Sequence, residues 1–242
     1  MKGFEKMYIK NEKDRQNAAL FDTDKLRNSK VLIIGLGGLG SPVAYALAGA
    51  GIGKLTLCDK DTVSGSNLNR QTLYTAKDIG KSKAKTACNV LSSFAPDCDI
   101  DFFDEEVNES NAEALVSDYN LVILAADNNR VRLDVNKACA KQKVMLLNVG
   151  IAKAFGSIYL YIPGKTPCLA CALGETESKD KHTCAACCGA VGSLAAMRAL
   201  SALCGADIHE GKIAVIDCLE LTVDLLSIRQ RSGCDICGGE QK

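Results

Sequence analysis

The 242-residue sequence predicts an α/β fold with a mainly parallel sheet. Short apolar runs alternate with longer helical segments, which is the pattern of strand–helix–strand crossover units. A glycine-rich turn lies directly after the first apolar run and before a helix. Hydrophobic residues make up 47% of the chain and the formal net charge is zero. This composition excludes a disordered chain and gives no electrostatic reason to expect nucleic-acid binding.

The predicted elements follow one another without a repeat or a linker. Strands are expected at 31–34, 54–58, 121–125 and 144–148, and helices at 42–50, 81–93 and 130–141. A more exposed strand is expected at 156–162, a helix of small residues at 190–204, and one or two late strands within 212–225. Residues 174–188 are the best loop candidate.

The longest uncharged stretch, residues 31–53, could span a bilayer by length alone. Seven of its residues are glycine and Pro42 interrupts it, so a strand, a turn and a buried helix are the better interpretation. The first 15 residues are charged throughout and contain no apolar signal segment. We therefore expect a cytoplasmic protein that does not interact with membranes.

The glycine turn has the pattern G-x-G-x-x-G, formed by Gly35, Gly37, Gly38 and Gly40. Glycines allow the backbone to approach a phosphate closely, and the following helix offers free N–H groups. Asp59, at the end of the next predicted strand, is placed to bind ribose hydroxyls. The motif predicts an adenine nucleotide site, and it does not distinguish a nicotinamide dinucleotide from ATP.

Charged and polar residues beyond the second and third predicted strands favour ATP. They are Asp61, Asn67, Arg70, Gln71, Lys83, Asp127 and Asn128. The carboxyl ends of strands are where ligands bind in open α/β sheets. Arg70 and Lys83 suit a triphosphate, and Asp127 suits a Mg²⁺ ion. A nicotinamide-dependent oxidoreductase, the first alternative, has no use for this set.

Thirteen cysteines are unusual for a protein of the reducing cytosol, where clusters point to metal ligands or reactive thiols. Three C-x-x-C pairs occur, at Cys168/Cys171, Cys184/Cys187 and Cys234/Cys237. Two such pairs make one tetrahedral zinc site. Spacing alone favours the first pair with the second.

The runs GLGGLGSPVAYALAGAGIG, DKDTVSGSNLNRQTLY, IGKSKAK and AADNNRVR resemble the ThiF/MoeB/HesA family, bacterial relatives of ubiquitin-activating enzymes. The resemblance covers residues 15–239. It implies a Rossmann-like ATP-binding fold and adenylation, with Mg²⁺ and ATP, of the C-terminal glycine of a ubiquitin-like sulfur-carrier protein ending in Gly-Gly. It implies one domain over 1–242, with a nucleotide-binding half at 1–150 and a carrier-binding and zinc half at 151–242.

Residue roles carried over from the family agree with the interpretation above. Gly38 would face the phosphates and Asp59 the ribose; Asn67, Arg70 and Lys83 would hold the triphosphate, and Asp127 would hold Mg²⁺. The pair Arg15-Gln16 resembles a family pair whose arginine reaches the ATP of the other subunit, which implies a homodimer. A sulfurtransferase or cysteine desulfurase would be a further partner.

The family's two zinc knuckles resemble CLAC and SGCDICGG, which favours Cys168/Cys171 with Cys234/Cys237 as the Zn²⁺ ligands. That choice leaves Cys184, Cys187 and Cys188 in the predicted loop. Cys184 is the candidate for a covalent link to the carrier, with Cys187 and Cys188 as alternatives. The pair Cys184/Cys187 could also be a redox switch or a weak metal site. The other alternative function is a non-catalytic nucleotide-binding scaffold.

Overall fold

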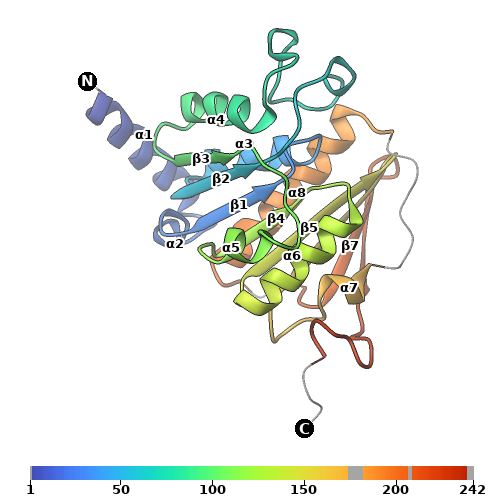
Figure 1. Cartoon of the computed structure of the whole chain (residues 1–242). Coiled ribbons are helices and arrows are strands. Elements are labelled where there is room, and N and C mark those ends of the chain that lie inside the picture. Colours follow the sequence, from blue (N-terminus) through green and yellow to red (C-terminus); the bar gives the residue numbers. More distant parts are fainter. Residues whose placement is uncertain (1, 174–181, 207–208, 239–242) are drawn as a thin grey trace.

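A computed structural model of the chain describes residues 2–173, 182–206 and 209–238 (Figure 1). The first half contains α1 (Lys2–Asn17), α2 (Thr23–Arg27), β1 (Lys30–Ile34), α3 (Gly40–Ala50), β2 (Lys54–Cys58), α4 (Lys83–Phe94), β3 (Asp99–Phe103), α5 (Ala112–Val116), β4 (Leu121–Leu124) and α6 (Asn129–Gln142). The second half contains β5 (Met145–Ala152), β6 (Phe155–Tyr161), α7 (Leu169–Ala172), α8 (Ala185–Leu203), β7 (Lys212–Asp217) and β8 (Thr222–Ser227). Two short 3-10 helices, η1 (Gly65–Asn67) and η2 (Ala76–Asp78), lie between β2 and α4.

The strands form one eight-stranded sheet in the order β3-β2-β1-β4-β5-β6-β7-β8. Strands β1 to β5 pair in parallel, and β6, β7 and β8 continue the sheet with antiparallel pairing. The predicted α/β fold, with a parallel sheet that continues into an antiparallel part, is therefore confirmed.

Both faces of the inner parallel strands β1, β2 and β4 are buried, which explains why their sequences are continuous apolar runs. Successive side chains alternate between two cores: Ile33 of β1 packs with α3, α4 and α8, while Leu32 packs with α5 and α6. Figure 1 shows α5 and α6 on one side of the sheet and α8 on the other. The helices on both sides of the sheet hold the strand ends in place. The polar loops of the site begin at these strand ends.

Several elements were absent from the sequence-based expectation, and two of them, β3 and α1, lack a strong apolar pattern. Strand β3 lies at an edge of the sheet and has the sequence DIDFF, with no fully buried residue. Helix α1 is largely exposed and polar. Its Lys13 bonds to the buried Asp97 at 2.7 Å, and Arg27 bonds to the same carboxylate at 2.7 Å. Ion pairs, which hydropathy does not reveal, hold α1 on the body.

The expected helix 190–204 begins earlier, at Ala185, so the loop prediction for 174–188 is wrong at its end. Ala185 and Ala186 favour a helix and Cys184 occupies the N-cap position. Cys187 and Cys188 therefore lie in the first turn of α8, whereas residues 174–181 lie outside the described residues. Among the described helices, α8 alone is long and apolar enough to cross a membrane, and 44% of its apolar 18-residue window is buried inside the protein.

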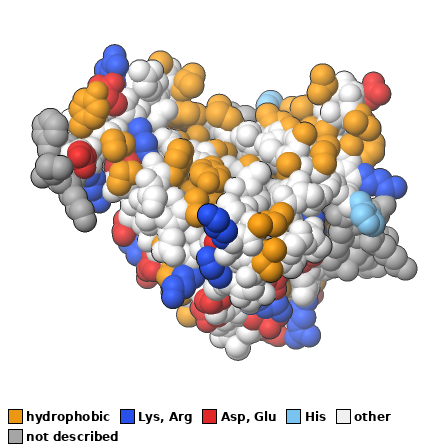
Figure 2. Space-filling view, turned by 90° about the horizontal axis from the view of Figure 1, so that it is seen from above, with side chains coloured by type: hydrophobic (Ala, Val, Ile, Leu, Met, Phe, Trp, Pro, Cys, Tyr) orange, Lys and Arg blue, Asp and Glu red, His pale blue; other side chains and the backbone are white. Residues whose placement is uncertain are grey.

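Exposed large hydrophobic side chains concentrate in the C-terminal half, where α8 and β8 carry Leu194, Met197, Val223, Leu225 and Leu226. Val223 and Leu225 pair with Ile216 and Ala214, which belong to the core beside α8, so both point to the α8 side of the sheet. We call Leu194, Met197, Val223 and Leu225 the apolar surface. Figure 2 shows hydrophobic side chains gathered on one part of the molecule, apart from most charged ones.

Candidate functional site

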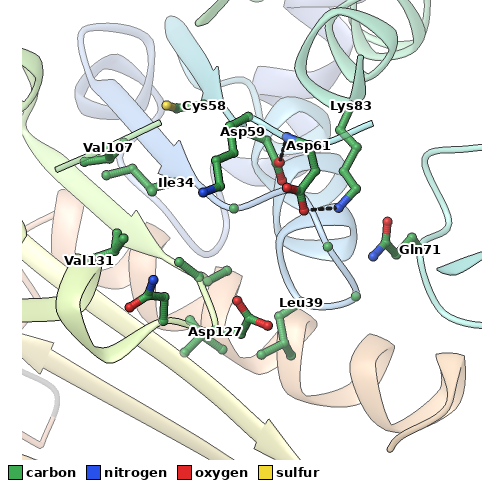
Figure 3. A pocket seen from close by; sticks show the side chains of 18 of the residues that line it. Ile34, Leu39, Cys58, Asp59, Asp61, Gln71, Lys83, Val107, Asp127 and Val131 are labelled. Atoms are coloured by element: carbon green, nitrogen blue, oxygen red, sulfur yellow. Dashed lines mark hydrogen bonds and ion pairs between the residues drawn. The ribbon is translucent and has the colours of Figure 1, made fainter. Parts of the chain in front are cut away.

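A cavity of about 360 Å³ opens at the carboxyl ends of the parallel strands (Figure 3). Strand order reverses at β1, because β2 lies on one side and β4 on the other. The loops after these strands diverge and leave a crevice, which is the usual ligand position in this type of sheet. The start of α8 closes one side of the cavity through Thr183 and Cys188.

The glycine turn forms the floor of the cavity. Gly35 has φ +92°, and a Cβ there would lie 2.8 Å from the carbonyl of Ala125 at the end of β4. A Cβ on Gly40 would lie 1.9 Å from the Gly35 oxygen. Only glycine fits at either position, so the turn brings the start of α3 against β1 and β4. The backbone of Gly35, Gly37 and Gly38 lines the cavity without side chains in the way.

Asp59, at the end of β2, holds this turn in place. Its Oδ2 accepts the Leu36 N–H at 2.7 Å, and its Oδ1 accepts the Asp61 N–H at 2.9 Å. Burial raises the pKa of Asp59, although these N–H groups and nearby Lys83 oppose the rise. The predicted ribose contact therefore belongs to a carboxylate that also orients the glycine turn.

Lys83 is the buried cation of the site. It is the first residue of α4, and its Nζ lies 2.9 Å from Oδ2 of Asp61. The lysine side chain is 6% exposed, whereas the Asp61 side chain is 57% exposed. Figure 3 shows Asp59, Asp61 and Lys83 together, with Asp127 across the cavity. A buried ammonium paired to one exposed carboxylate can exchange that partner for a phosphate.

Arg70 lies along the glycine turn, beside the α8 end of the cavity. A Cβ on Gly38 would lie 3.2 Å from Arg70 Cγ and 2.8 Å from Cys188 Sγ. The guanidinium donates to Asn69 Oδ1 at 2.8 Å and to the Ser66 carbonyl at 3.3 Å. These exposed contacts position a cation above the turn.

Asp127 follows β4, and Asn128 caps α6 by accepting the Arg130 N–H at 2.8 Å. The Asp127 carboxylate is exposed and lines the cavity, so it is a suitable donor for Mg²⁺, which binds proteins through few carboxylates and keeps several waters. Among the residues that the structure describes, Gln71 Oε1 is buried in this region without a hydrogen-bond partner. It offers an acceptor to a bound molecule.

The structure therefore brings most of the predicted nucleotide residues together. Those that line the cavity are Gly35, Gly37, Gly38, Asp59, Asp61, Arg70, Gln71, Lys83, Asp127 and Asn128. Gly40 acts in packing, and Asn67 lies in η1, outside the lining. Arg15 is exposed on α1, where it pairs with Glu12 at 2.8 Å, and it does not line the cavity of its own chain.

The sequence interpretation missed some lining residues. Arg132 donates from α6 to the Ala126 carbonyl at 3.1 Å, and Lys60 pairs with Glu106 at the cavity edge. Arg132 lies in the AADNNRVR run, in the helix that follows Asp127, so this motif could have identified it as a residue of the site. No motif marked Glu106, because its loop follows β3, which was itself missed.

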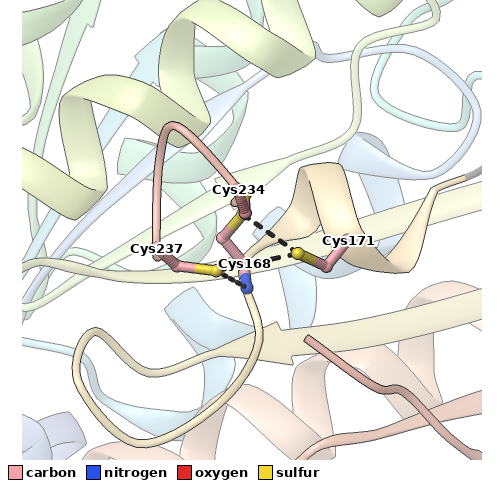
Figure 4. A group of neighbouring side chains, drawn as sticks. All are labelled: Cys168, Cys171, Cys234 and Cys237. Carbon is pink, nitrogen blue, oxygen red and sulfur yellow. Dashed lines mark hydrogen bonds between the residues drawn. The ribbon is translucent and has the colours of Figure 1, made fainter. Parts of the chain in front are cut away.

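The four predicted zinc ligands meet in one cluster (Figure 4). The sulfur atoms of Cys168, Cys171, Cys234 and Cys237 lie within 4.8 Å of one another. Individual Sγ–Sγ distances are 4.0 Å for Cys168–Cys171, 3.6 Å for Cys168–Cys234 and 3.7 Å for Cys171–Cys237. A tetrahedron with Zn–S bonds of about 2.3 Å has edges of about 3.8 Å. The pairing that spacing alone favoured, with Cys184/Cys187, is wrong.

Backbone N–H groups donate to sulfur atoms of the cluster. The Cys168 N–H donates to Cys237 Sγ at 3.3 Å, and the Arg231 N–H donates to Cys171 Sγ at 3.4 Å. Burial opposes ionisation of Cys234. The N–H groups of Cys237 and Ile236, together with the Cys171 and Cys168 thiols, outweigh burial and lower the pKa of Cys234 to about 6. A set of four sulfurs with this support is typical of a structural zinc site.

The cluster lies at the opposite end of the sheet from the cavity. Strand β6 runs antiparallel to β5, so its last residue, Tyr161, pairs with Leu146 at the start of β5. The chain then reaches Cys168 near the amino ends of the parallel strands. A metal held there is remote from the nucleotide cavity, which is why its expected role is structural.

The chain matches one family profile and is similar to a series of curated proteins, among them two from Escherichia coli. The profile of the ThiF family matches residues 13–236. The molybdopterin-synthase adenylyltransferase of Escherichia coli is 35% identical over 230 residues, 90% of this chain and 92% of the relative. The sulfur carrier protein ThiS adenylyltransferase of Escherichia coli is 32% identical over 228 residues, 91% of this chain and 90% of the relative.

A solved structure shares the fold of the chain. It is MccB of Escherichia coli, crystallised with ATP, which superposes with a TM-score of 0.81 and 26% identity. The match covers 89% of this chain and 68% of MccB.

Proposed function

Since the chain belongs to the ThiF family, we propose that it adenylates the C-terminal glycine of a small ubiquitin-fold sulfur-carrier protein. An oxygen of the carrier's terminal carboxylate attacks the α-phosphorus of ATP. The bond from that phosphorus to the bridging oxygen breaks, and pyrophosphate leaves. The product is an acyl-adenylate on the carrier.

The main support for this proposal is that Arg70, Lys83 and Asp127 line the same cavity as the glycine turn. Lys83 and Arg70 bind the triphosphate and stabilise the charge that grows on the departing pyrophosphate. The free N–H groups of the turn contact phosphate oxygens. Asp59 binds the ribose and keeps the turn oriented. The enzyme contributes positioning and charge stabilisation in this step, with no covalent chemistry of its own.

Asp127 would hold Mg²⁺ together with phosphate oxygens of the nucleotide. When bound, the ion supplies positive charge that neutralises the triphosphate. The Asp127 carboxylate suits this role because it is exposed at the end of β4, on the far side of the cavity from Lys83.

The acyl-adenylate becomes a thiocarboxylate only when a sulfur donor displaces AMP. We therefore place a sulfurtransferase or a cysteine desulfurase beside this enzyme, in the cytoplasm. One relative is named for molybdopterin synthase and the other for the carrier ThiS, and their identities to this chain are nearly equal. This supports a carrier of the ThiS or MoaD type without favouring either. The product then serves thiamine, molybdopterin or a related biosynthesis.

An exchange assay tests the function. Labelled pyrophosphate should appear in ATP when the enzyme, Mg²⁺ and a ThiS-like or MoaD-like carrier are mixed, and a carrier without its terminal glycine should abolish the exchange. Nucleotide binding without exchange would indicate a scaffold. Redox activity that depends on a nicotinamide cofactor, together with no exchange for any carrier, would support the oxidoreductase instead.

We further propose that the protein works as a homodimer. In its own chain Arg15 lies on the exposed α1, outside the cavity, so any role of Arg15 in catalysis requires the cavity of a second copy. The apolar surface of Leu194, Met197, Val223 and Leu225 is the proposed contact, because solvent-exposed apolar side chains grouped on one face mark an association site.

The variant Val223→Glu tests the contact. We expect the dimer dissociation constant to rise at least about tenfold, because a carboxylate would be buried without a partner. Light scattering at several concentrations measures it. Leu226→Glu is the matched control: Leu226 is 54% exposed on the same strand but pairs with Ile213 on the opposite face of the sheet. Equal effects of the two variants, or a monomeric wild type, would contradict the proposed contact.

A further inference from the structure

The first turn of α8 carries a second pair of close sulfurs, separate from the four-cysteine cluster. The Sγ atoms of Cys184 and Cys187 lie 3.5 Å apart. Cys184 occupies the N-cap of this 19-residue helix and Cys187 lies in its first turn. A disulfide bond is about 2.0 Å long, so the two sulfurs need to approach by only about 1.5 Å to form one.

The two thiols differ in a way that suits disulfide exchange. Cys184 is exposed, and the Cys187 N–H at the helix start, followed by the Cys187 thiol, lowers the pKa of Cys184. Cys187 is half-buried, and its contact with Cys184 raises the pKa of Cys187 to about 11. The exposed member is therefore the attacking thiolate, and its neighbour stays protonated until it is needed.

Neighbouring cysteines do not replace either member. Cys188, one residue further, is buried, and its Sγ points to Gly38 in the cavity instead of to the pair. Cys218 follows β7 and lies near Cys187 and Cys188. The pair therefore has one reachable sulfur and one sulfur positioned to resolve it.

We propose that Cys184 and Cys187 form a redox-active dithiol whose substrate is a low-molecular-weight disulfide of the glutathione type. The Cys184 thiolate attacks one sulfur of that disulfide, the S–S bond breaks, and one thiolate leaves. Cys187 loses its proton to solvent and attacks Cys184 Sγ. This forms the Cys184–Cys187 bond and expels the second thiolate. The protein loses two electrons and two protons, and the small disulfide becomes two thiols.

The pair lies next to the nucleotide cavity, so its oxidation changes the thiols available there. Thr183 and Cys188 flank the two cysteines, and both line the nucleotide cavity. The oxidised pair removes the one exposed thiol at this rim, so the redox state of the surroundings decides whether the rim presents a nucleophile. The proposal does not depend on adenylation, and its test contains neither ATP nor a carrier.

The experiment uses reduced, zinc-loaded full-length protein treated with oxidised glutathione, quenched with acid and mapped by mass spectrometry. We expect the wild type to lose two hydrogens and to yield a linked peptide that joins Cys184 to Cys187. The variant Cys187→Ser should instead keep one glutathionyl group on Cys184, because the resolving thiol is missing. Cys184→Ser should lose both products.

The matched control is Cys218→Ser, which removes the neighbouring thiol and should still give the Cys184–Cys187 link. A wild type that accumulates a mixed disulfide on Cys184 would overturn the proposal, since Cys187 would then not resolve it. A Cys187–Cys218 link, or both thiols remaining reduced while the exposed Cys184 resists glutathione, would overturn it as well.

Discussion

Replacing Lys83 with alanine is expected to lower pyrophosphate exchange by at least about 10²-fold, the effect of losing one preorganised electrostatic group. The Lys83 ammonium is almost fully buried, so its field acts on the phosphates with little solvent screening. Its loss also removes a positive charge near Asp59, and the pKa of Asp59, already raised by burial, should rise further. Both changes reduce the stabilisation of the transition state of adenylation by the site.

Lys81→Ala is the matched control for this prediction. Lys81 is two residues away, 58% exposed, and paired with Asp78 outside the cavity. Its replacement should leave exchange within about twofold of wild type, since exposed ion pairs contribute little. Near wild-type exchange in Lys83→Ala, with the thermal transition unchanged, would remove Lys83 from the site.

Replacing Cys234 with serine is expected to release the zinc that we propose for the four-cysteine cluster. Metal content should fall from one zinc per chain to almost none, because one thiolate of a closed tetrahedron is lost and Cys234 is 8% exposed. Without the ion, the C-terminal knuckle is no longer joined to α7. The midpoint of thermal unfolding should fall by about 10 °C or more.

Cys88→Ser is the control for this variant, since Cys88 is a part-buried cysteine of α4 outside the cluster. Atomic absorption and calorimetry on both variants give the comparison. Nucleotide affinity should change much less than stability in Cys234→Ser, because the cluster lies at the other end of the sheet from the cavity. Unchanged zinc in Cys234→Ser would contradict the assignment of the ligands.

Local patterns predicted the parts of the fold that carry continuous apolar sequence. Strands β1, β2, β4 and β5 are buried on both faces, so their positions follow from hydropathy alone. Edge strand β3 and helix α1 contact the body through charges and partial burial, and no hydrophobic period marks them. The start of α8 was predicted wrongly because the cysteines at 184–188 suggested a loop with reactive thiols. The alanines between them favour a helix.

The candidate site was predicted in outline because its residues follow motifs that lie at strand ends. The partners of each residue could not be predicted, because they come from loops distant in sequence. Asp59 bonds to Leu36, and Cys188 meets Gly38 across a separation of 150 positions along the numbering. The four-cysteine cluster shows the same limit: spacing favoured the nearer pair, Cys184/Cys187, and the fold joins Cys168/Cys171 with the more distant pair, Cys234/Cys237.

The close approach of Cys171 and Cys234 in the four-cysteine cluster affects how the chain folds. The proposed zinc would bridge these residues and close a long segment that contains α8, β7 and β8. Closing so long a segment removes conformational entropy from the unfolded chain, on the order of 4 kcal/mol if the bridge acts like a covalent link. Helix α8 lies within this segment, so the proposed zinc should affect how readily the chain folds more than the geometry of the finished cavity.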